Sequence, residues 1–135
     1  MVLLSWSHEC IVGVESMDDQ HAILMDALNE LRLSLVHGSE RKTICQHLER
    51  LIEFTQMHFE NEEQLLNQEG FPGLPEHRAA HQLLLSQIQA KLEHAKHNEA
   101  VEFQPLLHFL RGWYLEHIQG LDQSYGSWLN ERGVF

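Results

Sequence analysis

The stretch HFENEEQLLNQEGFPGLPEHRAAH, residues 58–81, decides the fold of this protein. Gly70 is expected to end a helix there, because glycine readily adopts the left-handed conformation found at helix C-termini. Pro75 suits the first turn of a following helix, where its missing N–H is not needed. A short connection places consecutive helices side by side and antiparallel. The stretch therefore predicts a helical hairpin.

Apolar residues recur every three or four positions on both sides of this hairpin, and no stretch shows the alternation typical of a strand. This period predicts four helices, at about 17–36, 40–68, 75–97 and 100–119. An N-terminal arm precedes them, and residues 121–129 are expected to add a short C-terminal helix. The expected fold is all-α, an antiparallel up-down-up-down four-helix bundle, with residues 1–135 forming one domain.

Several details of these helices are also expected. Ser16, with Asp19 three residues later, resembles a capping box at the first helix, and Ser39 is the expected N-cap of the second. Pro105 implies a later start or a bend in the fourth helix. The expected core residues are Leu24, Leu28, Leu31 and Leu35 in the first helix, Ile44, Leu48, Leu51, Ile52, Thr55, Phe59 and Leu66 in the second, Leu83, Leu84, Ile88 and Leu92 in the third, and Leu106, Phe109, Leu110 and Trp113 in the fourth.

The charge balance is strongly acidic. Lys and Arg number 9 against 20 Asp and Glu, which gives a formal charge of −11. This argues against nucleic acid and anionic membranes as partners, because both require clustered cations. We also expect no secretory signal and no membrane insertion, and therefore a cytoplasmic protein. Cys10 and Cys45 lie far apart in the sequence and are expected to be structural or incidental thiols.

The 11 histidines are the most informative part of the composition. Two pairs, His58 with Glu62 and His77 with His81, have the four-residue spacing that places both side chains on one helix face. An antiparallel bundle would bring these pairs to the same end as His21 near the start of the first helix. The same end would hold two further residues, His117 and Asp122, near the end of the fourth helix.

Seven such groups are too many for one tetrahedral zinc ion but suit two ions that share bridging carboxylates. Imidazole ligands favour iron, copper or zinc. A single His/Glu pair is more often a surface hydrogen bond than half a metal site, but the agreement of four helices favours a metal site. His117 and Asp122 are five residues apart, about 140° on an ideal helix. We therefore expect a π-like turn or a helix end near Gly120.

The sequence resembles the hemerythrins, and specifically the bacterial single-domain kind, over essentially its whole length. The matching motifs are Trp6 in the arm, Asp18-x-Gln20-His21, His58-Phe59-x-x-Glu62-Glu63, His77-x-x-x-His81 and Trp113-x-x-x-His117-Ile118-x-x-x-Asp122.

The resemblance implies a non-haem di-iron centre that binds dioxygen reversibly. It implies that one iron is held by His77, His81 and His117, and the other by His21 and His58. It further implies that the bridges are Glu62, Asp122 and an oxo or hydroxo group. The expected apolar lining consists of Leu24, Phe59, Trp113 and Ile118.

Tyr114 departs from the family pattern, which usually has an aliphatic residue three positions before the last histidine. Its hydroxyl could hydrogen-bond the bound ligand, block the open site or point outward. Glu63 is expected to be a solvated or supporting carboxylate. The other six histidines are interpreted as surface or capping residues: His8, His37, His47, His94, His97 and His108.

Three functions follow from the resemblance. The first is a stand-alone oxygen-binding protein for carriage, storage or delivery, which is not an enzyme and has dioxygen as its partner. The second is an oxygen or redox sensor that contacts a protein partner the sequence does not identify. The third is a di-iron enzyme that reduces peroxide or nitric oxide, or oxidises ferrous iron.

Overall fold

The computed structural model describes residues 5, 7–98 and 102–135, and this part of the chain is helical with no strand. The predicted all-α bundle is confirmed. The elements are η1 (His8–Cys10), α1 (Glu15–Val36), α2 (Arg41–Glu69), α3 (Leu74–His97), α4 (Gln104–His117), the π-helical segment η2 (Ile118–Asp122) and α5 (Gln123–Glu131).

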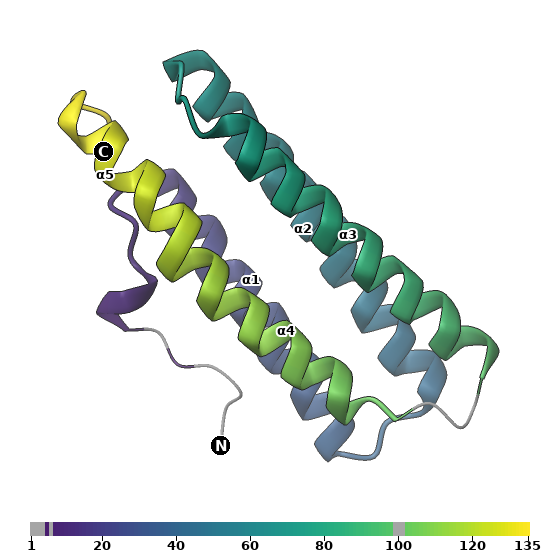
Figure 1. The fold of residues 1–135 in the computed structure, drawn as a ribbon. Coiled ribbons are helices and arrows are strands. Elements are labelled where there is room, and N and C mark those ends of the chain that lie inside the picture. Colours follow the sequence, from purple (N-terminus) through teal and green to yellow (C-terminus); the bar gives the residue numbers. More distant parts are fainter. Residues whose placement is uncertain (1–4, 6, 99–101) are drawn as a thin grey trace.

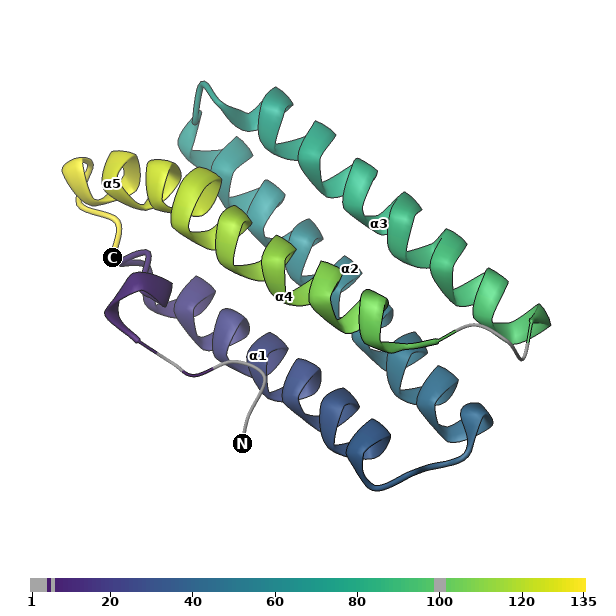
Figure 2. The same cartoon turned by 60° about the horizontal axis from the view of Figure 1, so that its bottom comes forward.

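The four long helices run up, down, up and down (Figure 1). α2 packs antiparallel against both α1 and α3, and α1 also contacts α4 (Figure 2). α5 continues α4 beyond η2 and lies near the N-terminal arm and the start of α1. This topology brings the beginnings of α1 and α3 to the same end of the bundle as the ends of α2 and α4.

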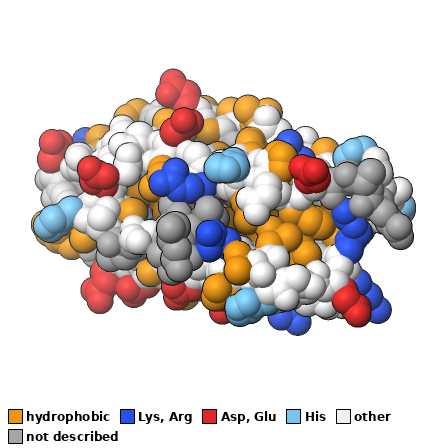
Figure 3. All heavy atoms as spheres, turned by 90° about the horizontal axis from the view of Figure 1, so that it is seen from below, with side chains coloured by type: hydrophobic (Ala, Val, Ile, Leu, Met, Phe, Trp, Pro, Cys, Tyr) orange, Lys and Arg blue, Asp and Glu red, His pale blue; other side chains and the backbone are white. Residues whose placement is uncertain are grey.

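Figure 3 shows the side of the molecule that faces down in Figure 1. On this face the lysine and arginine side chains lie in several small groups, separated by apolar and acidic side chains. Within the described ranges, none of the helices is both long enough and apolar enough to cross a bilayer.

The predicted capping box at the first helix is wrong. α1 begins at Glu15, so Ser16 already lies inside the helix, and no side chain caps its first turn. The Asp18 carboxylate instead accepts hydrogen bonds from two backbone N–H groups of the arm, those of Val12 at 2.8 Å and Gly13 at 3.2 Å. Asp18 therefore ties the arm to the first turn of α1, whereas Asp19, the acidic residue of the predicted box, is exposed.

The predicted N-cap of the second helix is also wrong. α2 begins at Arg41, with Glu40 before it and no side-chain cap. The backbone N–H of Ser39 donates to the carbonyl of Ser34 at 3.0 Å, so Ser39 completes the end of α1. In the fourth helix the later start is confirmed, because Pro105 lies in the first turn of α4.

The core follows the predicted apolar stripes, with one error. Three of the predicted residues, Leu35, Phe109 and Trp113, are only partly buried. Leu83 is wrong, because its side chain is 61% exposed. The buried face of α3 contains Leu84 and residues three or four positions away from it, and Leu83 falls about 100° outside that face. The other predicted core residues are buried.

Gly126 in α5 lies directly against the arm. A Cβ atom added to Gly126 would lie 2.0 Å from the backbone carbonyl oxygen of Val12. We expect Gly126→Ala to lower the free energy of unfolding by about 1–3 kcal/mol, because a backbone atom must move to make room. Urea denaturation measures the effect.

Gly112→Ala in α4 is the matched control, because its added Cβ meets nothing within 4 Å. Alanine favours the helix by up to about 1 kcal/mol over glycine, so this variant should be as stable as the parent or more stable. Equal stability of Gly126→Ala and the parent would contradict the close packing of α5 on the arm.

Candidate metal centre

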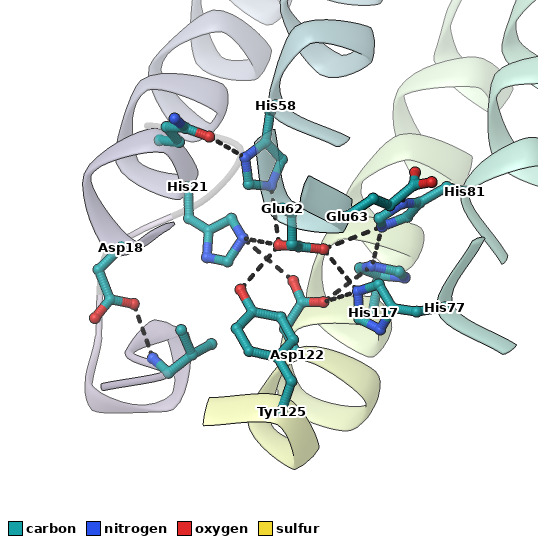
Figure 4. A network of polar contacts seen from close by, with 12 residues as sticks. Asp18, His21, His58, Glu62, Glu63, His77, His81, His117, Asp122 and Tyr125 are labelled. Carbon is teal, nitrogen blue, oxygen red and sulfur yellow. Dashed lines mark hydrogen bonds and ion pairs between the residues drawn. The ribbon is translucent and has the colours of Figure 1, made fainter. Parts of the chain in front are cut away.

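Seven polar side chains meet in the interior near one end of the bundle (Figure 4). Each is at most 7% exposed. They come from five elements: His21 from α1, His58 and Glu62 from α2, His77 and His81 from α3, His117 from α4 and Asp122 from η2. The structure therefore brings together all the residues that the spacing singled out.

Glu62 lies between two groups of histidines. Its Oε1 atom is 2.6 Å from Nε2 of His77 and 3.1 Å from Nε2 of His81. Its Oε2 atom is 3.3 Å from Nε2 of His58 and 3.4 Å from Nε2 of His21. Each carboxylate oxygen thus faces a different group.

Asp122 repeats this division. Its Oδ1 atom is 3.0 Å from Nε2 of His77 and 3.1 Å from Nε2 of His117, whereas Oδ2 is 3.2 Å from Nε2 of His21. The π-helical segment η2 explains how Asp122 reaches the interior, because it adds a residue to the turn after His117. The prediction of a π-like turn near Gly120 is confirmed.

Two sets of side chains could each hold a cation. Glu62, His77, His81 and His117 form one set, and His21, His58 and Glu62 form the other. Within each set the ligand atoms lie within 4.8 Å of one another. Glu62 belongs to both, which is the arrangement that a shared bridging carboxylate requires.

Several buried atoms of the centre lack hydrogen-bond partners. Both ring nitrogens of His21 and both carboxylate oxygens of Asp122 are fully buried without one among the described residues. Nε2 of His21 is close to Asp122 but does not form a hydrogen bond with it. Leaving such groups unsatisfied costs about 1–3 kcal/mol each, and more for charged groups. Bound cations would satisfy Nε2 of His21 and both oxygens of Asp122, so these residues fit a metal centre.

The carboxylates also raise the pKa of nearby imidazoles. Burial alone would lower the pKa of His21 and His77, but Asp122 and Glu62 outweigh it and raise both pKa values to about 9. Burial likewise opposes ionisation of Glu62 and Asp122, yet the surrounding histidines hold the pKa of each carboxyl below its usual range. Without metal, the centre therefore carries imidazolium–carboxylate pairs at neutral pH.

Metal loading is expected to release protons. Ligation requires neutral imidazole, whereas His21 and His77 are protonated in the metal-free protein below a pKa of about 9. Loading near neutral pH should therefore release at least about two protons per chain. The number should fall as the pH rises through about 9, where the rings are already neutral. Titration in weak buffer with a pH indicator measures it; iron binding without proton release would contradict the assignment.

Comparison with known proteins identifies the family. The family described as Hemerythrin HHE cation binding domain matches residues 12–129. The chain belongs to the hemerythrin family. It is 33% identical over 132 residues to the Bacteriohemerythrin of Methylococcus capsulatus, which covers 96% of this chain and 99% of that one. The Bacteriohemerythrin of Stenotrophomonas maltophilia is 26% identical over 127 residues, 94% of this chain and 82% of the relative.

Solved hemerythrin structures share the fold. A wild-type hemerythrin crystal structure superposes with a TM-score of 0.85 at 29% identity, covering 93% of this chain and 96% of the other. A variant hemerythrin in which tyrosine replaces one leucine gives a TM-score of 0.87 at 30% identity, covering 94% and 97%. The resemblance to hemerythrins noted in the sequence is thus confirmed.

Two side chains contact histidines of the centre from outside it in this hemerythrin fold. Nδ1 of His58 is 2.6 Å from Oε1 of Gln20, and Nδ1 of His81 is 2.9 Å from a carboxylate oxygen of Glu63. Arg78 donates to the other Glu63 oxygen at 3.2 Å. In both histidines Nε2, the other ring nitrogen, faces Glu62. Such contacts fix the ring orientation and tautomer of a metal-binding histidine.

Tyr125 was missed by the sequence reasoning. Its hydroxyl donates a hydrogen bond of 2.8 Å to Oε2 of Glu62 (Figure 4). Burial, reinforced by the charge of Glu62, raises the pKa of this phenol well above its usual value, so it remains a donor. A signal existed, because Tyr125 lies three residues after Asp122 and helical residues so spaced share a face.

Two of the expected apolar wall residues contact histidines of the centre. Phe59 stacks on the His81 ring with centroids 3.6 Å apart, and Trp113 stacks on His117 at 5.1 Å. Leu24 and Ile118 are also buried. A surface pocket of about 250 Å³ between α3 and α4 is lined in part by Trp113 and His117.

The outward orientation considered for Tyr114 is wrong. The residue is fully buried, and its hydroxyl donates to the backbone carbonyl of His21 at 2.8 Å. Burial raises the pKa of this phenol, so it also stays protonated. The hydroxyl therefore links α4 to α1.

Other predicted residues lie outside the centre. Cys10 and Cys45 are buried, unpaired thiols. Trp6, part of the motif in the arm, lies outside the described residues. The six remaining histidines are exposed or half-buried and join neither ligand set: His8, His37, His47, His94, His97 and His108.

Proposed function

We propose that this protein binds dioxygen reversibly at a di-iron centre, for carriage, storage or delivery. Membership of the hemerythrin family supports a di-iron, oxygen-binding domain. The observation that carries the proposal is the position of Glu62 and Asp122. In each carboxylate, one oxygen faces one group of histidines and the second oxygen faces the other group. Two carboxylates placed in this way suit two adjacent ions rather than one.

In this proposal one iron is held by His77, His81 and His117, and the other by His21 and His58. Glu62 and Asp122, together with a solvent-derived oxo or hydroxo group, would hold both ions. The His21–His58 side offers one histidine fewer, so an iron held there would have a position for dioxygen. A bound iron pair would supply the two electrons on which reversible dioxygen binding depends.

The residues around this position are proposed to exclude water. Leu24, three residues after His21 on α1, and Phe59, whose ring stacks on His81, are buried apolar side chains, and neither offers a proton. The Tyr114 hydroxyl is occupied by the His21 carbonyl, so the ring adds bulk without a free donor. An apolar lining favours release of dioxygen over release of peroxide, because peroxide must take up protons.

The colour of the reduced, iron-loaded protein tests this function. Exposure to dioxygen is expected to produce a visible absorption band, and purging with inert gas should remove it over repeated cycles. Irreversible oxidation without such a band would contradict reversible binding. Sustained turnover of peroxide or nitric oxide with a reductant would instead indicate an enzyme.

A further inference from the structure

We propose that Tyr125 is a positioning residue that sets how strongly Glu62 binds the iron on the His21–His58 side, and so shifts the reduction potential of the centre. This inference rests on the proposed function. The observation behind it is the hydrogen bond of 2.8 Å between the Tyr125 hydroxyl and Oε2 of Glu62 in the protein interior.

The hydrogen bond reaches only one oxygen of the carboxylate. Oε2 is the atom that faces His21 and His58, at 3.4 and 3.3 Å. Oε1, which lies 2.6 Å from Nε2 of His77, does not accept a hydrogen bond from the Tyr125 hydroxyl. Tyr125 therefore makes the two ends of the proposed bridge unequal.

Tyr125 is held firmly in this position. The residue is fully buried in α5, and its ring packs edge-on against His77 with centroids 5.4 Å apart. Its neighbour Gly126 lies against the backbone of Val12, so the arm keeps α5 in place. The phenol is therefore held by its hydrogen bond, by the His77 ring and by the packing of α5 on the arm.

An oxygen that accepts a hydrogen bond has less electron density to donate to a metal, and contacts of this kind shift the properties of metal centres. With Tyr125 present, Oε2 is the weaker donor, which favours the reduced state of the adjacent iron. Loss of the hydroxyl should strengthen the donation and favour the oxidised state. The direction of the potential shift is thus fixed by which atom accepts the hydrogen bond.

The test compares the iron-loaded parent with Tyr125→Phe. The variant is expected to retain both irons, to have a lower midpoint potential and to oxidise several-fold faster in air. Tyr114→Phe removes a hydrogen bond of equal length from an equally buried tyrosine, but that bond ends on a backbone carbonyl. Its potential shift should be smaller.

A second variant reverses the change without removing the phenol. The chain contains two tyrosines, so in the Tyr114→Phe background a ring-fluorinated tyrosine supplied during expression labels position 125 alone. Fluorination makes the phenol a stronger hydrogen-bond donor at nearly unchanged size. The midpoint potential should therefore be higher than that of the unlabelled Tyr114→Phe protein. This protein decides the matter if Tyr125→Phe fails to fold or to hold iron.

The outcomes separate the two proposals. Two bound irons with unchanged potentials, or shifts of the same sign for the phenylalanine and fluorotyrosine proteins, would overturn the role of Tyr125 and leave the proposed function intact. A parent protein that does not hold two irons would overturn both.

Discussion

Glu62→Gln is expected to reduce the iron content from two ions per chain to one or none. Glutamine keeps the size of the side chain but replaces one carboxylate oxygen by a nitrogen that does not bind iron. It also removes the negative charge that both histidine groups face at 2.6–3.4 Å. At least one proposed iron therefore loses its bridging oxygen. Elemental analysis after anaerobic loading and removal of free iron measures the result.

Glu63→Gln is the matched control. Glu63 is the adjacent residue on the same helix, but it contacts the far side of the His81 ring and is 24% exposed. This variant should retain both irons, with weakened binding at most, because the loss of a supporting contact typically costs 10–100-fold in metal affinity. Equal iron content in Glu62→Gln and the parent would contradict the bridging role.

Phe59→Ala is expected to lower the free energy of unfolding by about 3–5 kcal/mol, the usual cost of deleting a buried aromatic ring. Phe59 is 2% exposed, and its ring lies parallel to that of His81, with an angle of 2° between the planes. Removing it leaves a cavity beside the histidines and takes away the surface that holds His81 in place. Urea denaturation at fixed free-iron concentration measures the change.

The control for this substitution is Phe54→Ala. Phe54 lies on the same helix but is only partly buried against the core. Its loss opens less of a cavity, so the decrease in stability should be clearly smaller. A Phe59→Ala protein no less stable than Phe54→Ala would show that the ring does not contribute to the interior as the structure indicates.

The sequence predicted the long helices and the meeting of the seven polar residues because both depend on regular spacing. Four-residue spacing places His58 and Glu62 on one face whatever surrounds them. The five-residue spacing of His117 and Asp122 breaks that rule. The mismatch was itself informative, because it indicated a π-like turn or a helix end near Gly120, and the structure contains a π-helical segment there.

The sequence could not predict which of several suitable side chains would make a given contact in the folded protein. Ser16 is a residue type that often caps helices, but α1 begins before it. The arm folds back onto this first turn, and the Asp18 carboxylate accepts hydrogen bonds from the backbone of the arm. Leu83 is as apolar as Leu84, and only the exact rotation of the helix decides which is buried. Such choices follow from tertiary contacts, which local patterns do not record.

The amount of dioxygen taken up and returned by the reduced, iron-loaded protein tests the central claim most directly. If Glu62 and Asp122 join two irons into one centre, each chain that carries two irons should bind a single dioxygen molecule. It should return that molecule when the gas pressure is lowered. Uptake that does not saturate at this ratio, or dioxygen that is consumed and not returned, would contradict the account.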